Sequence, residues 1–510
     1  MTSHQQLAER FEFRNILPEE ADQAVLIEQI CFPPNEACSE ARMKERVALL
    51  QELFLVAVDK ENGKIAGFLN GVSTNEAVFR DEFFTDITLY EPSGANVMLM
   101  GLDVLPEYRG QGLAREIVRQ YAAREQEKGR KALFLTCLDA KVSMYEKFGF
   151  KDHGIANSTW GGEEWHEMSM QLLPMPKGLS KKEIMELLLR EEYGYLPEKA
   201  YHVEAERVAI DPSFCAGGAD LVTLKLKCKA VWGEFEFPIY YVCPKKAQKP
   251  VPAFIHINFT DRIPDKFQPT EEIIDAGYAV LTIYYEDVTK DDGDFTNGLA
   301  GVVYPDGIRK KDQCGKIGLW AWAAMAAMEY ALTLPELDPA RISVIGHSRL
   351  GKTALLAGAL EERFYCAISN NSGCSGAAIS RNKGGESIKA IYTRFPYWFC
   401  ENYEKYMEKE GELPFDQHYL LAANAPHRVV VGSAVRDLWA GPKNEYLSCV
   451  AASDYYKEQG LTGLISEKTE PEAGDFFSEG HICYWMRSGG HYLGRADWAK
   501  YIEYLNQSWK

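Results

Sequence analysis

Several features are missing from this 510-residue sequence, and each absence removes a class of protein. No stretch approaches the ~18 consecutive apolar residues that a membrane-spanning helix needs. The 12 cysteines form no CxxC pair and no CxxC…HxxxH spacing, so neither a zinc site nor a disulfide framework is expected. Positive charge is in deficit, with 56 Lys and Arg against 74 Asp and Glu. The formal net charge of −18 disfavours a protein that coats nucleic acid or an anionic membrane.

The remaining composition is that of an ordinary soluble protein, with 46% hydrophobic and 25% charged residues. The first residues, MTSHQQLAERFEFRN, contain no apolar segment, so no secretory signal is expected and the predicted location is the cytoplasm. A chain of this length exceeds what one hydrophobic core supports, which predicts two or three domains. We find no internal repeat.

The hydrophobic pattern changes near residue 172. The run WHEMSMQLL is followed by a breaker cluster, Pro174 to Gly178, which is typical of a linker. An amphipathic helix then follows, with Ile184, Leu187 and Leu188 on one face. We therefore predict a domain at 1–172, a linker at 173–182 and a domain at 183–510.

The second domain combines two kinds of strand pattern. Residues 202–243 alternate apolar and polar side chains, which predicts an antiparallel layer. Continuous apolar runs, typical of buried parallel strands, follow at 251–259, 278–285, 341–348, 366–372 and 428–435. Helical segments separate them, and the one at 318–334 is apolar nearly all round. The pattern predicts an α/β fold with a mostly parallel, doubly wound sheet.

In the first domain, a predicted strand from Val97 to Val104 leads into a Gly-x-Gly turn that opens a long helix. The turn reads Arg109, Gly110, Gln111, Gly112, Leu113, Ala114. Glycines allow successive backbone N–H groups to turn inward, and a helix N-terminus attracts anions. The turn therefore predicts a pyrophosphate site, with a simple tight turn as the alternative.

This turn, together with FLTCLDAKVSMYEKFGFKDHG, CFPPNEACS and STWGGEEWHEM, resembles the GNAT acetyltransferases over roughly residues 10–171, closest to the arylalkylamine branch. The resemblance implies a mixed α/β domain that uses acetyl-CoA. The backbone of Leu102, Asp103 and Val104 would then pair with the pantetheine arm. Residues 109–114 would hold the pyrophosphate.

The same resemblance makes Tyr145 the acid that protonates the departing thiolate, and a packing residue is the alternative. The animal arylalkylamine enzymes carry two histidines where this chain has Met98 and Met100. Methionine cannot deprotonate an ammonium group, so another base, a water chain or an amine of lower pKa is required. Acetyl transfer to a small amine is the main prediction, and a non-catalytic acetyl-CoA-binding or docking module is the alternative.

In the second domain, residues 341–352 read as a strand, a sharp turn at Gly346-His-Ser348 and a helix start. Such an elbow lifts a serine hydroxyl above the sheet edge and directs helix N-terminal amides toward an oxyanion. The second glycine, Gly351, comes one residue later than in the common Gly-x-Ser-x-Gly spacing. Ser348 is the predicted nucleophile.

The elbow GHSRLGK resembles that of the glucuronoyl esterases, carbohydrate esterase family 15, whose bacterial members are often labelled acetylxylan esterases. Further stretches agree from residue 183 onward: LREEYGYLP, GLWAWAAMAAMEYAL, ALEERFYCAISNNSGCSGAAISR, FPYWFCENYEKY, LPFDQHYLLAANAPHRV and SAVRDLWAGPKNEYLS. The resemblance implies a serine esterase that cleaves a carbohydrate ester, either glucuronoyl or acetyl, without a metal.

Hydrolase chain order places the acid and then the histidine after the nucleophile. His491, after the run ICYWM, is the predicted base, since His481 precedes that strand and should face the opposite edge. Many family members carry a glutamate where this chain has Asn371, so Asp437 after the next strand is the predicted acid. His347 is expected to pack or hydrogen-bond locally.

Three further residues near the elbow receive predictions. By the family resemblance Arg349 supplies its backbone N–H, and its guanidinium, to the oxyanion hole. Lys352 is a candidate to bind a sugar hydroxyl or uronate, or else a solvated surface lysine. Trp439 either stacks on a sugar ring or packs.

Overall fold

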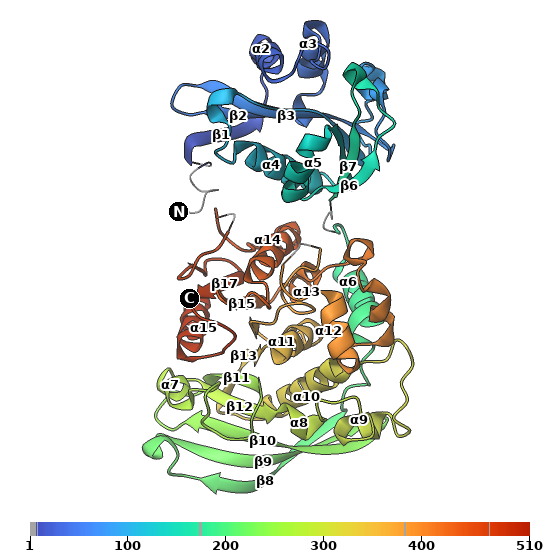
Figure 1. The fold of residues 1–510 in the computed structure, drawn as a ribbon. Coiled ribbons are helices and arrows are strands. Elements are labelled where there is room, and N and C mark those ends of the chain that lie inside the picture. Colours follow the sequence, from blue (N-terminus) through green and yellow to red (C-terminus); the bar gives the residue numbers. More distant parts are fainter. Residues whose placement is uncertain (1–6, 8, 173–175, 382–383, 469, 510) are drawn as a thin grey trace. The chain divides into compact units, whose positions relative to one another are not determined.

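The computed structural model describes residues 7, 9–172, 176–381, 384–468 and 470–509 (Figure 1). The chain forms two compact units, Met1–Met175 and Pro176–Lys510, which are described here one at a time. Part of the predicted linker, 173–175, lies outside the described residues, and helix α6 (Lys181–Leu188) begins before its predicted end. Within the described ranges, no helix has both the length and the apolar character that crossing a membrane requires.

The N-terminal unit is built on a seven-stranded sheet with the order β1-β2-β3-β4-β5-β7-β6 (Figure 1). Its strands are β1 Phe11–Asn15, β2 Phe54–Asp59, β3 Lys64–Thr74, β4 Asn96–Val104, β5 Ala132–Cys137, β6 Lys151–Ile155 and β7 His166–Gln171. Its helices are α2 Ala21–Cys31, α3 Glu40–Leu49, α4 Leu113–Glu127 and α5 Asp139–Phe148. The β4–β5 pair is parallel, and the other paired strands are antiparallel.

Helices cover both faces of this sheet. Ile117 and Tyr121 of α4 belong to one buried cluster. Ile27 of α2 and Val47 of α3 belong to a second cluster, together with strand residues such as Phe68. The predicted strand into the Gly-x-Gly turn is therefore present as β4, buried between these layers, and the helix after it is α4, which covers one face of the sheet.

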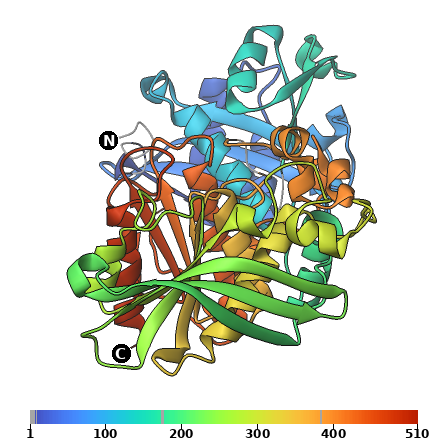
Figure 2. The same ribbon diagram turned by 90° about the horizontal axis from the view of Figure 1, so that it is seen from below.

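The C-terminal unit is built on a ten-stranded sheet with the order β16-β17-β15-β14-β13-β11-β12-β10-β9-β8. Its strands are β8 His202–Asp211, β9 Ala219–Ala230, β10 Gly233–Pro244, β11 Val251–Asn258, β12 Ala279–Tyr284, β13 Leu337–His347, β14 Cys366–Asn370, β15 Arg428–Ala434, β16 Phe476–Phe477 and β17 Ile482–Arg487. The strands from β12 to β17 in this order pair in parallel. Strands β8, β9 and β10 form the predicted antiparallel layer, drawn in green in Figure 2.

The helices of this unit are α6, α7 Thr270–Asp275, α8 Tyr285–Val288, α9 Gly298–Val303, α10 Lys316–Ala331, α11 Arg349–Leu360, α12 Ile388–Arg394, α13 His418–Ala422, α14 Pro442–Glu458 and α15 Arg495–Ser508. They lie on both sides of the sheet. Ile255 of β11 packs in the cluster that contains α10 and α11, whereas its neighbour Phe254 packs in the cluster that contains α7 and α15. Helix α10 is buried along nearly its whole length, as its apolar sequence predicts.

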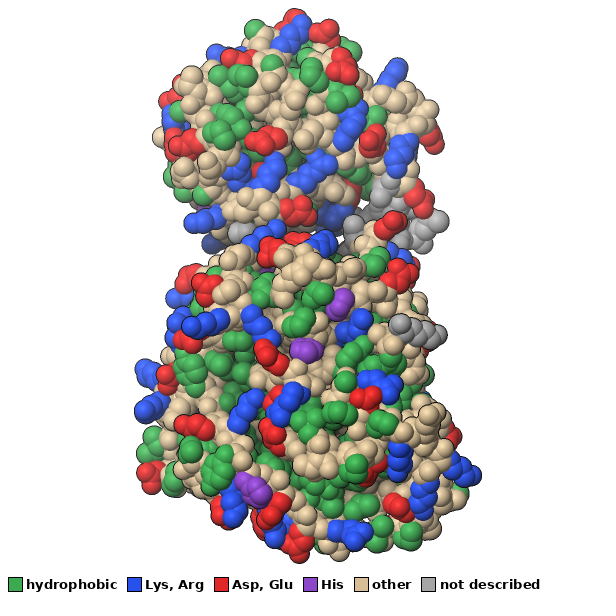
Figure 3. All heavy atoms as spheres, turned by 180° about the vertical axis from the view of Figure 1, so that it is seen from behind, with side chains coloured by type: hydrophobic (Ala, Val, Ile, Leu, Met, Phe, Trp, Pro, Cys, Tyr) green, Lys and Arg blue, Asp and Glu red, His purple; other side chains and the backbone are tan. Residues whose placement is uncertain are grey.

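The surface carries both signs of charge. On the face drawn in Figure 3, basic and acidic side chains are interspersed over each unit. The excess of acidic residues is therefore distributed over this face rather than gathered in one place.

Candidate active sites

Ser348 stands between the end of β13 and the start of α11. Its backbone has φ 57° and ψ −127°, a positive φ that residues with a side chain adopt only under constraint. The Ser348 N–H donates to the Asn370 carbonyl at 2.8 Å, and its own carbonyl accepts from the N–H of Gly351 at 2.9 Å. The sequence therefore folds here into the strand–turn–helix elbow that it predicts, with the hydroxyl-bearing residue at the apex.

The two glycines of the elbow have separate packing reasons. A Cβ on Gly346 would lie 2.0 Å from the Leu350 carbonyl oxygen, so no side chain fits there. A Cβ on Gly351 would lie 3.0 Å from Ser369 Oγ, because the first turn of α11 packs closely against β14. Gly351, which comes one residue later than in the common Gly-x-Ser-x-Gly spacing, thus allows α11 to pack closely against β14.

Asp437 and His491 meet at the same edge of the sheet as Ser348. Each of the three follows the carboxyl end of a parallel strand: β13, β15 and β17 respectively. His491 Nδ1 lies 2.7 Å from Asp437 Oδ2, with side-chain exposures of 44% and 5%. His481 precedes β17 at the opposite end, where its Nδ1 lies 3.0 Å from the Thr462 carbonyl. The structure brings the predicted base and acid together and leaves His481 apart.

The Asp437 carboxylate is held by several donors. Asn371 Nδ2 donates to Oδ2 at 2.8 Å, and the Ala440 N–H donates to Oδ1 at 3.4 Å. Burial by itself raises the pKa of Asp437, but the hydrogen bond and charge of His491, with these donors, outweigh it and lower the pKa below its ordinary value. The asparagine at the family's glutamate position therefore acts on the acid as a hydrogen-bond donor.

His347 forms a wall of the site rather than a second base. Its ring centroid lies 4.5 Å from that of His491, and its Nδ1 lies 2.7 Å from Asn370 Oδ1. Burial, together with the neighbouring His491, lowers the pKa of His347 to about 3. The ring is therefore neutral, and the prediction that it packs and hydrogen-bonds locally is confirmed.

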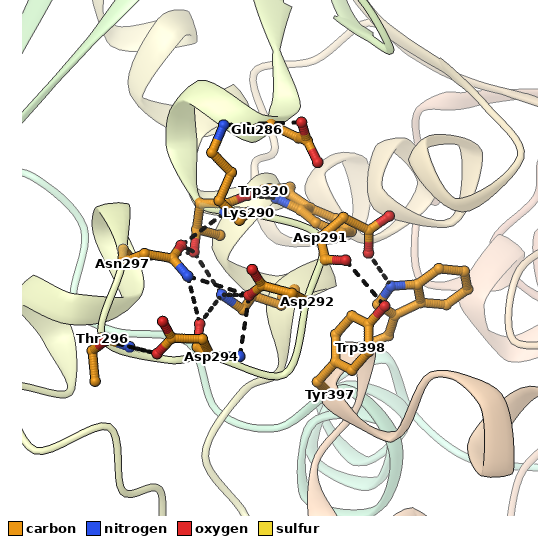
Figure 4. Close-up of polar contacts among 12 residues, drawn as sticks. Glu286, Lys290, Asp291, Asp292, Asp294, Thr296, Asn297, Trp320, Tyr397 and Trp398 are labelled. Carbon is orange, nitrogen blue, oxygen red and sulfur yellow. Dashed lines mark hydrogen bonds and ion pairs between the residues drawn. The ribbon is translucent and has the colours of Figure 1, made fainter.

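Arg349 is the first residue of α11, so its backbone N–H has no acceptor inside the helix. Its guanidinium forms an ion pair with Asp291 and lies over the Trp398 ring, 4.7 Å from the centroid. Asp291 in turn accepts from Trp398 Nε1 at 2.7 Å, as drawn in Figure 4. A carboxylate and an aromatic ring thus fix the side chain that follows the nucleophile.

The loop that presents Asp291 is itself tied down by polar contacts (Figure 4). Asn297 Nδ2 donates to the Asp294 carbonyl at 2.8 Å, and Trp320 Nε1 donates to the Thr289 carbonyl at 3.1 Å. Buried Lys316 donates to the Asp294 carbonyl at 2.7 Å. Sequence reasoning did not find this loop, because its contacts to Arg349 and Trp398 join segments that are far apart in the chain.

The structure corrects one alternative for each of the two predicted sugar-binding residues. Lys352 is 4% exposed and donates to the carbonyls of Ser372 and Cys374, so it is not a solvated surface lysine. Trp439 is 55% exposed, so it does not serve as a packing residue. Contact of either side chain with a sugar stays a prediction.

In the N-terminal unit, β4 separates from β5 part of the way along its length. Among the described residues, β4 pairs with β5 over Asn96, Val97 and Met98, whereas β4 continues to Val104. The predicted pantetheine-pairing segment, Leu102–Val104, therefore lies where the parallel pairing has ended. The Val104 carbonyl accepts from Arg109 Nε at 2.8 Å, which ties the strand to the turn.

The turn after β4 requires its glycines. Gly110 has φ 75° and Gly112, which caps α4, has φ 87°, both in the left-handed region. A Cβ on Gly110 would meet no atom of the described residues within 4 Å, so its backbone is approachable. Gln111 is held by Arg10, with Arg10 Nη1 3.2 Å from Gln111 Oε1. Leu113 and Ala114 begin the helix.

Tyr145 lies on α5, half-buried, with its ring edge-on to Phe148 and Phe150 at 5.9 and 5.6 Å. Burial raises its pKa, so the hydroxyl keeps its proton at neutral pH and can donate it. Met98 and Met100 are buried apolar side chains at 0% and 7% exposure. The geometry thus supplies a proton donor, while neither methionine offers a base.

Sequence reasoning treated Asp103 through its backbone alone. In the structure its carboxyl is wholly buried beside Glu28 of α2, at 0% and 4% exposure. The strand pattern gave no signal for this pair, because Glu28 lies on a helix far from β4 in the chain. As for metals, the described residues contain no group of three or more His, Cys, Asp or Glu placed to hold an ion.

Comparisons with known proteins match both units. Residues 230–460 match the family model described as "Glucuronyl esterase, fungi", and residues 22–150 match "Acetyltransferase (GNAT) family". A carbohydrate esterase named MZ0003, from an unknown prokaryotic organism, is 42% identical over 238 residues, 46% of this chain and 55% of that one. A 4-O-methyl-glucuronoyl methylesterase of Podospora anserina is 28% identical over 277 residues, 52% and 53% of the two chains. The matches span about half the length of these curated relatives.

Among solved structures, a promiscuous CE15 esterase from a marine bacterial metagenome is 32% identical, with a TM-score of 0.58, over 64% of this chain and 90% of that one. A glucuronoyl esterase from Solibacter usitatus is 30% identical, with a TM-score of 0.58, over 65% and 92%. These relatives share with the C-terminal unit the class of mixed α/β hydrolases. The chain belongs, through this unit, to carbohydrate esterase family 15, and its N-terminal unit carries a GNAT domain.

Proposed function

We propose that the C-terminal unit is a serine esterase that hydrolyses glucuronoyl esters of carbohydrates. The observation that carries this proposal is the 2.7 Å contact between Asp437 Oδ2 and His491 Nδ1 at the sheet edge where the Ser348 elbow stands. Several relatives are named as 4-O-methyl-glucuronoyl methylesterases, which favours a glucuronoyl ester over the acetyl ester that the sequence leaves open.

In this mechanism Ser348 Oγ attacks the ester carbonyl carbon while His491 Nε2 takes its proton. Asp437 keeps Nδ1 protonated and stabilises the imidazolium that forms. The carbonyl oxygen becomes an oxyanion, to which the Arg349 N–H at the start of α11 donates, with the guanidinium adding positive charge. His491 then protonates the departing alcohol, and water, deprotonated by the same imidazole, releases the glucuronic acid and restores Ser348.

Lys352 and Trp439 complete the proposed site. An ester of glucuronic acid carries no free carboxylate until it is cleaved, so these side chains would read hydroxyl groups and the ring face. Trp439 offers an exposed indole two residues after the acid. Lys352 has two of its three N–H groups committed to backbone carbonyls, which leaves one for a sugar hydroxyl.

The test is hydrolysis of benzyl glucuronate and of acetylated xylan by the full-length chain, with Ser348→Ala as the matched variant. We expect release of benzyl alcohol, weaker or no release of acetate, and a loss of at least about 10³-fold in the variant. Release of acetate without release of benzyl alcohol would show that the substrate is an acetyl ester and would leave the proposed mechanism unchanged. Full activity of Ser348→Ala would contradict the proposal that Ser348 is the nucleophile.

For the N-terminal unit we propose acetyl transfer from acetyl-CoA to a small amine. Support comes from the GNAT family match, the left-handed glycines of the turn and the separation of β4 from β5 beside residues 102–104. Tyr145 would protonate the thiolate that leaves. Calorimetry with acetyl-CoA, followed by a thiol-release screen over amines, tests this function. Binding without thiol release for any amine would favour the non-catalytic module.

A further inference from the structure

The oxyanion that forms at the Ser348 elbow needs more than one hydrogen-bond donor. In α/β-hydrolases the N–H of the residue after the nucleophile, here Arg349, is joined by an N–H from the loop after a neighbouring strand. In this unit β11 pairs with β13, and the loop after β11 begins with Phe259. The Phe259 N–H already donates to Asn258 Oδ1 at 2.8 Å. This arrangement favours the Arg349 guanidinium as a second donor to the oxyanion.

A carboxylate holds this guanidinium on one side. Arg349 forms an ion pair with Asp291, whose side chain is 6% exposed. The same carboxylate accepts from Trp398 Nε1 at 2.7 Å and from the Tyr285 hydroxyl at 3.3 Å. Because two neutral donors also hold the carboxylate, its position does not depend on Arg349 alone. The ion pair is therefore formed with an acceptor that is fixed in advance.

Aromatic rings lie against the same guanidinium. The Arg349 Cζ atom lies 4.7, 5.5 and 5.6 Å from the ring centroids of Trp398, Phe395 and Phe259. The rings of Phe395 and Trp398 stack on each other, with centroids 3.9 Å apart. Ring faces attract a cation and restrict the conformations that its side chain can adopt. Since 26% of the Arg349 side chain remains exposed, the side chain is held without being enclosed.

The loop that carries Asp291 is folded around a buried ammonium group. The Lys316 side chain is 0% exposed and donates to Thr289 Oγ1 at 2.8 Å and to the Asp294 carbonyl at 2.7 Å. These two contacts lie on either side of Asp291 in the chain. The Tyr397 hydroxyl donates to the Asp291 carbonyl at 3.1 Å, as Figure 4 shows. The backbone that presents the carboxylate is therefore fixed before and after Asp291.

We propose that Asp291 is a positioning residue of the esterase, which holds the Arg349 guanidinium beside the carbonyl oxygen of the bound ester. The inference rests on the ester hydrolysis proposed above and concerns the same site. Asp291 acts through Arg349 and does not itself contact the reacting atoms. The oxyanion forms only as Ser348 Oγ attacks, so the guanidinium stabilises the transition state more than the bound ester. Loss of Asp291 should therefore lower kcat and leave KM nearly unchanged.

The test measures hydrolysis of benzyl glucuronate by the full-length chain with Asp291→Asn. This variant keeps an oxygen for the Trp398 N–H but lacks the negative charge, so the guanidinium loses its ion pair. We expect kcat to fall about 10-fold and KM to change less than about 2-fold.

Asp338→Asn is the matched control. Asp338 also forms an aspartate–arginine pair, with Arg341 Nε at 2.5 Å, but it lies near the start of β13, at the opposite end from Ser348. The control should change neither kcat nor KM. An unchanged kcat in Asp291→Asn, or an equal loss in Asp338→Asn, would overturn the proposal.

A double-mutant cycle separates positioning from a general structural effect. Arg349→Ala removes the guanidinium and keeps the backbone N–H, so kcat should fall at least as far as in Asp291→Asn. In the Arg349→Ala background, Asp291→Asn should lower kcat by less than about 2-fold further. A loss from Asp291→Asn that is equally large with and without Arg349 would show a merely structural role and would overturn the proposal.

Chemical rescue gives a second readout, which decides if thermal unfolding shows that Asp291→Asn does not fold. Free guanidinium, at a non-denaturing concentration and constant ionic strength, should bind beside Asp291 in Arg349→Ala and restore part of kcat. Urea is the control, because it is planar and of similar size but uncharged. An equal response of Arg349→Ala to both compounds would overturn the proposal.

The outcomes also separate this inference from the proposed function. A wild-type chain that hydrolyses benzyl glucuronate, together with an unchanged kcat in Asp291→Asn, would overturn the positioning role alone. A wild-type chain that hydrolyses neither benzyl glucuronate nor acetylated xylan would overturn the esterase, and the positioning role with it.

Discussion

The two units treat a buried aspartate at the end of a strand in opposite ways. Asp437, after β15, receives hydrogen bonds from His491 and Asn371, and its pKa is lowered. Asp103, at the end of β4, lies beside the second buried carboxyl group of Glu28, and its pKa is raised. The pKa of the same kind of carboxyl group is therefore lowered in one unit and raised in the other.

The difference shows that the neighbouring groups, added to burial, decide the direction in which the pKa of each carboxyl group moves. Burial raises the pKa in both places, and it is the largest single influence at each. An anion that already has its donors is suited to hold an imidazolium in place. A carboxyl group that lies beside a second carboxyl group is instead easier to protonate. The predictions below test this contrast in order of expected effect.

Removing the charge of Asp437 should have the largest effect. Asp437→Asn keeps the shape but cannot stabilise the imidazolium and favours the wrong His491 tautomer, so kcat on benzyl glucuronate should fall by about 10³–10⁴-fold. The stability of the C-terminal unit should change little. More than a tenth of the wild-type rate would contradict the role of Asp437.

Making the surroundings of Asp437 resemble those of Asp103 should have an intermediate effect. Asn371→Asp replaces the donor at 2.8 Å with a second carboxyl group, which raises the pKa of the pair. We expect esterase activity at neutral pH to fall on the order of 10-fold and its acid limb to move to higher pH. Asn371→Ser, which removes the amide donor without adding charge, is the control and should move the limb upward by less.

The raised pKa of Asp103 should also make the stability of the N-terminal unit sensitive to pH. Because the folded pKa of Asp103 is raised, its stabilising contribution is complete below the ordinary carboxyl range and is lost as pH rises through the folded value. Asp103→Asn should remove part of that loss, on the order of 1–2 kcal/mol at pH 8. Hydrogen exchange in peptides from α2 and β4 measures it. Equal pH dependence of exchange in the wild-type chain and in Asp103→Asn would contradict the raised pKa of Asp103.

The smallest effect concerns the exposed indole. Trp439→Ala removes a stacking surface without disturbing the core, so KM for benzyl glucuronate should rise by roughly 3–10-fold with kcat nearly constant. Leu438→Ala is a matched control, since Leu438 is 72% exposed and adjacent. An unchanged KM in Trp439→Ala would contradict the proposed contact between Trp439 and the sugar.

Much of the fold could be predicted because the relevant signals are local. The apolar runs from 251–259 to 428–435 each contain a strand, and the turn at Ser348 follows from its own residues. Asp437 and His491 could be placed together because parallel strands bring their carboxyl ends to one edge. These inferences need only chain order and strand direction.

The remaining features depend on contacts that no local pattern encodes. The pairing of Glu28 with Asp103 depends on the packing of α2 on the sheet. The position of the Arg349 guanidinium depends on the contact between Asp291 and Trp398, which are far apart in the chain. The burial of Lys352 depends on the path of the chain after β14. Each was accessible only once the elements were assembled.

The His347 ring is uncharged although it lies beside the proposed catalytic base, His491. With its pKa lowered to about 3, it does not gain a proton between pH 4 and pH 8. The His347 ring therefore stays uncharged near neutral pH, although its centroid lies 4.5 Å from that of His491. Nuclear magnetic resonance of the His347 ring should therefore show no proton uptake near neutral pH.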